Sequence, residues 1–152
     1  MTWFRRIRIA LLIVLVGPLL LMAGSKVNMA AADWRTANRE SANIAPSPAE
    51  TREAVVQVYG ARTYGWRAVF AIHTWIAVKP EGAASYTTYQ VIGWRAFCGD
   101  SALVIRDDIP DRHWFGSRPE VLADLRGAAA AKAIVEIERA VKAYPYPDTY
   151  RT

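Results

Sequence analysis

The chain has 152 residues, and 53% of them are hydrophobic, including six tryptophans and seven tyrosines. This is enough for one domain with a packed core and excludes a disordered protein. The formal charge of +5 includes Arg5, Arg6 and Arg8, so the rest of the chain carries only 5 − 3 = +2, which argues against nucleic-acid binding. Cys98 is the single cysteine, which excludes an intramolecular disulfide and a thiolate metal cluster.

The amino terminus has the pattern of a membrane-targeting segment, which we place at residues 1–25. An apolar run of 15 residues, 9–23, follows the three arginines and is broken only by Gly17-Pro18. Its length lies between that of a signal peptide and that of a spanning helix. One alternative is an uncleaved single-pass anchor in the inner membrane, and the other is a signal peptide cleaved near residues 30–32. In both cases the positive-inside rule predicts that the main domain is extracytoplasmic, either anchored or secreted into the periplasm.

The rest of the chain divides into a polar linker, residues 26–52, and an α+β domain, residues 53–152. Apolar runs separated by glycine and proline predict strands at 54–62, 67–78, 86–96 and 102–106. Helical periodicity is strongest over 128–144, and a proline at the first turn favours a short helix over 119–125. We therefore predict an antiparallel meander of about four strands, with the C-terminal helix packed on one face.

His73 interrupts the most apolar of these runs and is the main candidate for chemistry. Strand alternation places Phe70, Ile72 and Thr74 on a core face, and His73 and Trp75 on the opposite face. That second face is either the floor of a pocket or the contact surface of a covering helix. His73 is accordingly a general base or a core histidine hydrogen-bonded to a neighbour such as Gln90 or Thr88.

Aromatic side chains form the second candidate site. The indoles can line a groove for sugars or apolar chains, or they can be ordinary core residues. The candidates for lining a pocket are Trp66, Trp75, Gln90, Trp94, His113 and Trp114.

Other chemical signals are weak. Asp107, Asp108, Asp111 and His113 match no metal-binding spacing, so we expect a solvated loop and no metal. Phosphate-binding glycine motifs and GxSxG do not occur, which argues against a nucleotide cofactor and against the commonest serine-hydrolase site. Neither a helix start nor a paired histidine is evident beside Cys98, so we expect an inert thiol.

Several segments together resemble a bacterial family known as domain of unknown function 3750. The resemblance implies a membrane-linked or exported protein whose activity is not established. The matching segments are Val56–Arg62, Gly65–Arg67, Phe70–Pro80, Gly93–Arg95, Asp111–Gly116, Asp124–Gly127 and Tyr144–Tyr146.

More remotely, the strand around His73 is similar to the histidine-bearing strand of circularly permuted papain-like (NlpC-type) hydrolases. That resemblance implies His73 as general base and assigns no nucleophile to Cys98. The expected function is a cell-envelope domain, non-catalytic or degenerate papain-like, held at the membrane and binding an envelope ligand. The alternatives are an amide or ester hydrolase that uses His73, and a structural envelope protein.

Overall fold

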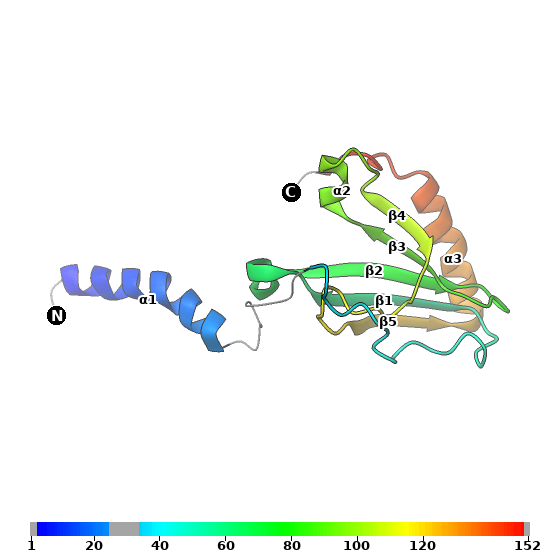
Figure 1. Ribbon diagram of the computed structural model, residues 1–152, viewed down its shortest axis with the longest axis horizontal. Coiled ribbons are helices and arrows are strands. Elements are labelled where there is room, and N and C mark those ends of the chain that lie inside the picture. Colours follow the sequence, from blue (N-terminus) through cyan, green and yellow to red (C-terminus); the bar gives the residue numbers. More distant parts are fainter. Residues whose placement is uncertain (1–2, 25–33, 151–152) are drawn as a thin grey trace.

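The computed structural model describes residues 3–24 and 34–150 (Figure 1). The first element, α1, is a 22-residue helix over Trp3–Gly24. Across the two described ranges, no helix combines the length and the apolar character that crossing a membrane requires. The expected cleavage region, residues 30–32, lies outside the described residues.

The domain contains one antiparallel sheet of five strands in the order β4-β3-β2-β1-β5 (Figure 1). The first four strands form the predicted meander, and β5 joins the free edge of β1. The sheet thus has β2, the strand of His73, at its centre. The strands are β1 Val55–Arg62, β2 Ile72–Lys79, β3 Thr87–Val91, β4 Leu103–Asp107 and β5 Glu120–Arg126; the helices are the 3-10 helix η1 Gly65–Val69, α2 Gly93–Phe97 and α3 Gly127–Lys142.

The fifth strand corrects the prediction of a short helix over 119–125. Short apolar runs do not distinguish helix from strand by periodicity, and here the unpaired edge of β1 supplies the backbone partners. Pro119 is buried directly before β5, a position where a missing N–H costs no ladder bond. Gln57 of β1 also donates a hydrogen bond of 3.1 Å to Asp124 of β5.

Two other boundaries differ from the prediction. The strand predicted over 67–78 begins only at Ile72, after η1, and the strand predicted over 86–96 ends at Val91 and is followed by α2. The C-terminal tail explains the second difference. The carbonyl of Pro147 accepts a hydrogen bond of 2.7 Å from the Ala102 amide, and the Tyr150 ring packs so closely on Gly93 that a Cβ there would clash with it.

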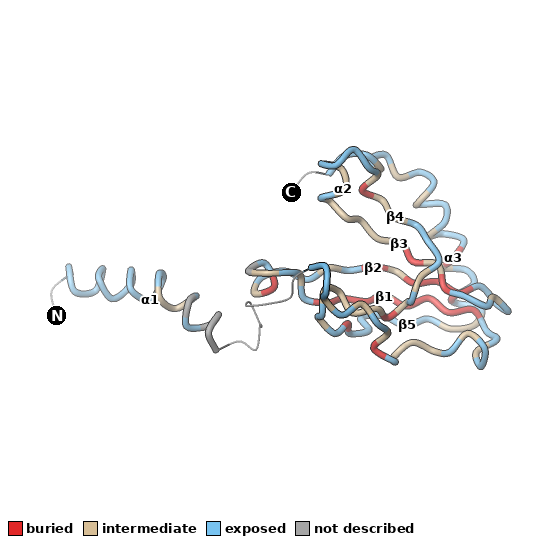
Figure 2. Tube along the Cα trace, in the orientation of Figure 1, coloured by how far each residue is buried: buried red, intermediate tan, exposed pale blue. Residues whose placement is uncertain are grey.

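Both faces of the sheet are covered, and each has its own apolar cluster. Figure 2 shows buried residues along β1 and β2. The predicted C-terminal helix is confirmed as α3, which packs over one face. That face includes Val78 and, partly buried, Ile76, whereas Ile72 at the start of β2 is 54% exposed. The other face carries Trp75 and Ala77. The buried members of the α3 cluster are Ala54, Val56, Val78, Ala130 and Ile134; those of the opposite cluster are Val55, Tyr59, Ala61, Trp75, Ala77 and Tyr86.

Loops rather than a helix cover the face that carries His73. Ile44 and Ala45, which lie in the stretch predicted to be a linker, pack against the cluster around Trp75. Trp114, from the loop between β4 and β5, packs there as well. The covering layer is therefore built from two segments that are far apart in the chain.

Candidate functional site

His73 lies between a polar neighbour and an aromatic one. Its Nε2 is 3.0 Å from Oε1 of Gln90 on β3, and the imidazole stacks on the Trp114 indole with ring centroids 3.6 Å apart and planes 15° apart. An amide oxygen only accepts, so Nε2 carries the proton and the neutral ring keeps its lone pair on Nδ1. The arrangement has the geometry of a base with an orienting partner.

Burial lowers the pKa of His73 below its usual value near 6.5, and the hydrogen bond to Gln90 opposes this only in part. The imidazole is therefore neutral at pH 7. Among the described residues, none of the hydrogen bonds of His73 reaches a serine, threonine or cysteine side chain. Cys98 is exposed at the C-terminal end of α2.

A set of stacked aromatic rings extends from the core to the surface. The Trp75 ring stacks on Tyr59 with centroids 5.5 Å apart, and its Nε1 donates a hydrogen bond of 2.7 Å to the Pro110 carbonyl. Trp114 continues the set outward to Trp94 of α2, at 5.8 Å between centroids. His73 thus belongs to an aromatic wall that is buried at Trp75 and 51% exposed at Trp94.

The loop after β4 corrects the expectation of a solvated acidic loop. Asp111 is 1% exposed. Its Oδ1 accepts a hydrogen bond of 2.7 Å from Ser41 Oγ, and its Oδ2 accepts bonds of 2.7 and 3.1 Å from the amides of Ile44 and Ala45. Burial alone would raise the pKa of Asp111, but these hydrogen bonds outweigh it and hold the pKa below its usual range.

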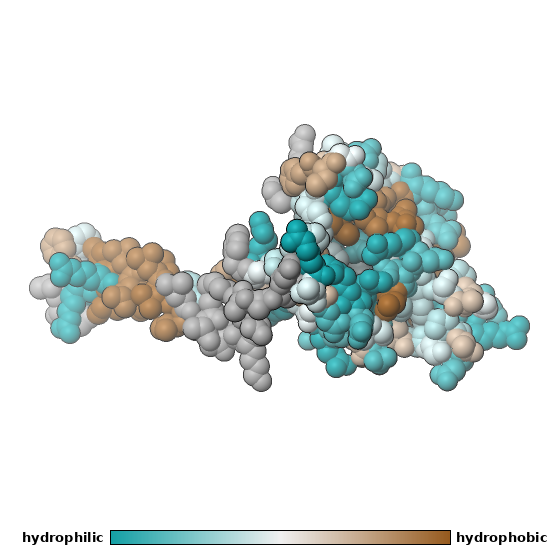
Figure 3. Space-filling model, viewed as in Figure 1, coloured by the Kyte–Doolittle hydropathy of each residue, from teal (hydrophilic) through white to brown (hydrophobic). Residues whose placement is uncertain are grey.

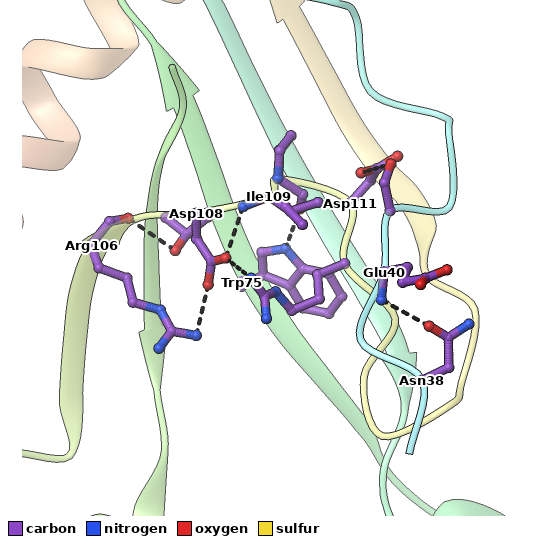
Figure 4. Close-up of polar contacts among 11 residues, drawn as sticks. Asn38, Glu40, Trp75, Arg106, Asp108, Ile109 and Asp111 are labelled. Carbon is purple, nitrogen blue, oxygen red and sulfur yellow. Dashed lines mark hydrogen bonds and ion pairs between the residues drawn. The ribbon is translucent and has the colours of Figure 1, made fainter. Parts of the chain in front are cut away.

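Asp108 is the second buried carboxylate of this loop, with a side chain 7% exposed (Figure 4). It forms ion pairs with Arg106, at 2.7 Å, and with Arg112, and it accepts a hydrogen bond of 2.8 Å from the Ile109 amide. One carboxylate therefore holds two guanidinium groups at the same point. Arg112 Nε is buried and has no hydrogen-bond partner among the described residues.

These groups border an open cleft between the sheet and the loop after β4. The space in it that a water-sized sphere can occupy is about 30 Å³, and Trp75 and Trp114 form its aromatic walls. Figure 4 shows Asp108 and Ile109 above Trp75, with the Arg106 side chain extending from β4 to the Asp108 carboxylate. The lining residues are Trp75, Thr88, Gln90, Arg106, Asp108, Ile109, Arg112 and Trp114.

The structure brings together some of the sequence-predicted site residues and separates others. Trp75, Gln90 and Trp114 line the cleft, His73 contacts two of its walls, and Trp94 packs at a tilt against Trp114 from outside. His113 instead points its Nδ1 at the Glu40 carbonyl, 2.9 Å away, and is not among the lining residues. The side chain of Trp66 lies outside the described part of the structure.

Sequence reasoning missed the charged side of the cleft. Arg106 and Arg112 match no motif spacing. The one available clue is that these two basic residues flank Asp108 in the sequence. The described residues contain no group of three or more histidine, cysteine, aspartate or glutamate side chains able to hold a metal ion.

The fold and the site together define a small α+β domain with an open aromatic cleft beside a half-buried, neutral histidine. Comparison with known families agrees with the resemblance seen in the sequence. The chain belongs to the family described as "Protein of unknown function (DUF3750)", whose model matches residues 53–152. No curated protein and no solved structure matches the chain.

Proposed function

We propose that this protein is a membrane-held domain of the bacterial cell envelope that binds a small envelope ligand in the cleft beside Trp114 and does not cleave it. The observation that carries the proposal is the cleft itself, which is open to solvent and walled by indoles. Its enclosed space of about 30 Å³ is far below the volume of pockets that surround a whole ligand. Only an end group of a larger molecule enters such a space, while the rest of that molecule lies across the open mouth.

The same proposal includes a degenerate papain-like origin. Support comes from His73, which stands on the central strand with a polar partner, Gln90, on the next strand. A nucleophilic site requires a nucleophile, a base and a group that orients the base. His73 and Gln90 have the positions of the last two. Because the ring of His73 stacks face to face on Trp114, we assign it a supporting role in the aromatic wall.

Replacing Trp114 with alanine tests ligand binding. Titration calorimetry of the full-length protein with muramyl dipeptide, a soluble cell-wall fragment, is expected to give saturable binding. The variant is expected to lose about tenfold or more in affinity, because it removes one of the two indoles that line the cleft. Trp114→Phe retains part of the stacking surface and is expected to lose less.

The matched control is Trp34→Ala, since Trp34 is 52% exposed and does not line the cleft. It should bind as the unmodified protein does. A heat signal that does not saturate with muramyl dipeptide would contradict the proposal. Equal affinity of the Trp114→Ala and Trp34→Ala variants would contradict it as well.

The membrane attachment rests on α1. Its apolar side chains are exposed, including Leu12, Val14 and Leu15 at 64–68%. Figure 3 shows this hydrophobic surface next to the hydrophilic N-terminal end of the helix. Arg5, Arg6 and Arg8 lie in its first turns. Apolar surface of this extent requires a partner, and a bilayer with anionic headgroups matches both the side chains and the charge.

Flotation with vesicles tests this attachment. The full-length protein is expected to float with vesicles that contain phosphatidylglycerol, and Leu12→Glu/Leu15→Glu is expected to stay in the dense fraction, because charged groups are costly in hydrocarbon. Val135→Glu is a suitable control, since Val135 is an exposed apolar residue of α3. Equal flotation of both variants would remove α1 as the anchor.

A further inference from the structure

We propose that the cleft recognises an oxyanion, either a carboxylate or a phosphate group, through Arg106 and Arg112. This inference rests on the proposed function, because it names the chemical class of the ligand for the same cleft. The first argument is charge. The lining contains two guanidinium groups and one carboxylate, so its net charge is 2 − 1 = +1. His73 beside it is neutral.

The second argument is the inventory of hydrogen-bonding groups. Asp108 is the only carboxylate among the lining residues, and it already accepts from Arg106, Arg112 and the Ile109 amide. The acceptor of Gln90 faces His73, and the Thr88 hydroxyl donates to the Arg106 carbonyl at 3.3 Å. The Trp75 N–H is engaged with Pro110. The acceptors that line the cleft are therefore largely engaged.

Donors, in contrast, remain. Each guanidinium has five N–H bonds, of which Asp108 uses one or two. Arg106 is 53% exposed, so its fork is accessible from solvent, and Arg112 contributes the buried, unpartnered Nε. A cleft with spare donors and engaged acceptors favours a ligand that only accepts, and a carboxylate or phosphate meets this requirement.

Asp108 acts as a positioning residue in this arrangement. Its two oxygens hold Arg106 from β4 and Arg112 from the following loop, which otherwise would repel each other. Ile109 and Trp114 form the apolar side of the same cleft. The ligand that fits is thus a small molecule or chain end with an oxyanion next to a flat or apolar group.

A pair of ligands that differ only in charge tests the inference. N-acetyl-phenylalanyl-alanine as the free acid and as the C-terminal amide are titrated into the full-length protein by calorimetry, and phenyl phosphate serves as the second arm. The acid, the phosphate or both are expected to bind at least about tenfold more tightly than the amide, and more weakly as salt increases. Whichever of the two ligands binds, the peptide acid or phenyl phosphate, identifies whether the oxyanion is a carboxylate or a phosphate.

Three substitutions test which arginine causes the preference for the charged ligand. Arg106→Gln is expected to abolish the preference for the charged ligand while the melting temperature changes little, because Asp108 retains Arg112 and the Ile109 amide. Arg139→Gln removes the same charge from an exposed position on α3 and should leave the preference intact. Arg112→Lys retains the charge but not the fork and is expected to weaken binding of the acid.

Three results would overturn the inference, and they differ in what else they affect. Equal affinity for acid and amide, both weakened by Trp114→Ala, would remove the oxyanion and leave the binding function in place. Absence of saturable binding by the acid, the amide, the phosphate and the cell-wall fragment would remove both. An unchanged preference in Arg106→Gln would also exclude this guanidinium as the determinant.

Discussion

The substitution Asp111→Asn is expected to lower the free energy of unfolding by about 2–4 kcal/mol. The carboxylate is buried and accepts hydrogen bonds from the Ser41 hydroxyl and from the amides of Ile44 and Ala45. An asparagine has one uncharged acceptor oxygen in place of two charged ones; if that oxygen stays on the amides of Ile44 and Ala45, the NH₂ group faces the Ser41 hydroxyl, which already accepts from the Asn43 amide. Urea unfolding followed by circular dichroism measures the loss, which should also appear as a lower melting temperature.

The pH dependence of stability gives a second readout of Asp111. Hydrogen bonds hold its pKa below the usual 3.8 in the folded state. The unfolded state therefore takes up the proton first as pH falls, so the stabilisation is complete above about pH 4 and is lost as pH falls through the lowered folded-state pKa. The difference between the parent protein and Asp111→Asn should shrink over that range.

The control for Asp111 is Asp100→Asn. Asp100 is 60% exposed and its ion pair with Arg95 is at the surface, so its loss is expected to cost less than about 1 kcal/mol. Similar destabilisation by both substitutions, or a loss in Asp111→Asn that does not change with pH, would contradict the assigned role of the buried carboxylate.

Replacing Trp75 with alanine should cost about 3–5 kcal/mol, the range for large aromatic side chains in a core. Trp75 is 5% exposed, stacks on Tyr59 and donates to the Pro110 carbonyl. Trp75→Phe separates these contributions, because it retains much of the stacking and leaves the carbonyl without its donor. We expect that variant to lose about 1–3 kcal/mol.

Chemical denaturation provides the measurement, and Trp34→Ala is the control for the removal of an indole. Trp34 is 52% exposed, so its loss should change stability little. A Trp75→Phe variant as stable as the parent protein would show that the bond to Pro110 contributes nothing. A Trp75→Ala variant as stable as Trp34→Ala would contradict the position of Trp75 in the core.

The elements that local pattern determines were predicted correctly, and those that depend on distant partners were not. Alternation and turn residues were sufficient for β1, for β4 and for β2 from Ile72 onward, and helical periodicity was sufficient for α3. The strand character of β5 depends on the open edge of β1, and the end of β3 depends on the tail at Pro147 and Tyr150. Neither partner is visible in a local window.

The same distinction applies to the site. Strand alternation places His73 and Trp75 on one face, and the hydrogen bond of His73 to Gln90 was one of the two alternatives that the sequence left open. The burial of Asp108 and Asp111 could not be predicted, because three carboxylates and an imidazole in a short stretch usually indicate solvent exposure. Their partners come from β4, from residues 41–45 and from within the loop itself.

Backbone hydrogen bonds hold residues 38–45 to the loop after β4, and this determines where a pull on the chain first acts. Ser41 pairs with Arg112 in an isolated bridge, and the carbonyls of Asn38 and Glu40 accept hydrogen bonds from Gly116 and His113. The chain that arrives from the N-terminal side thus reaches the loop that borders the cleft before it reaches β1. A pull on residues 38–45 therefore acts on the loop that borders the cleft before it acts on the sheet.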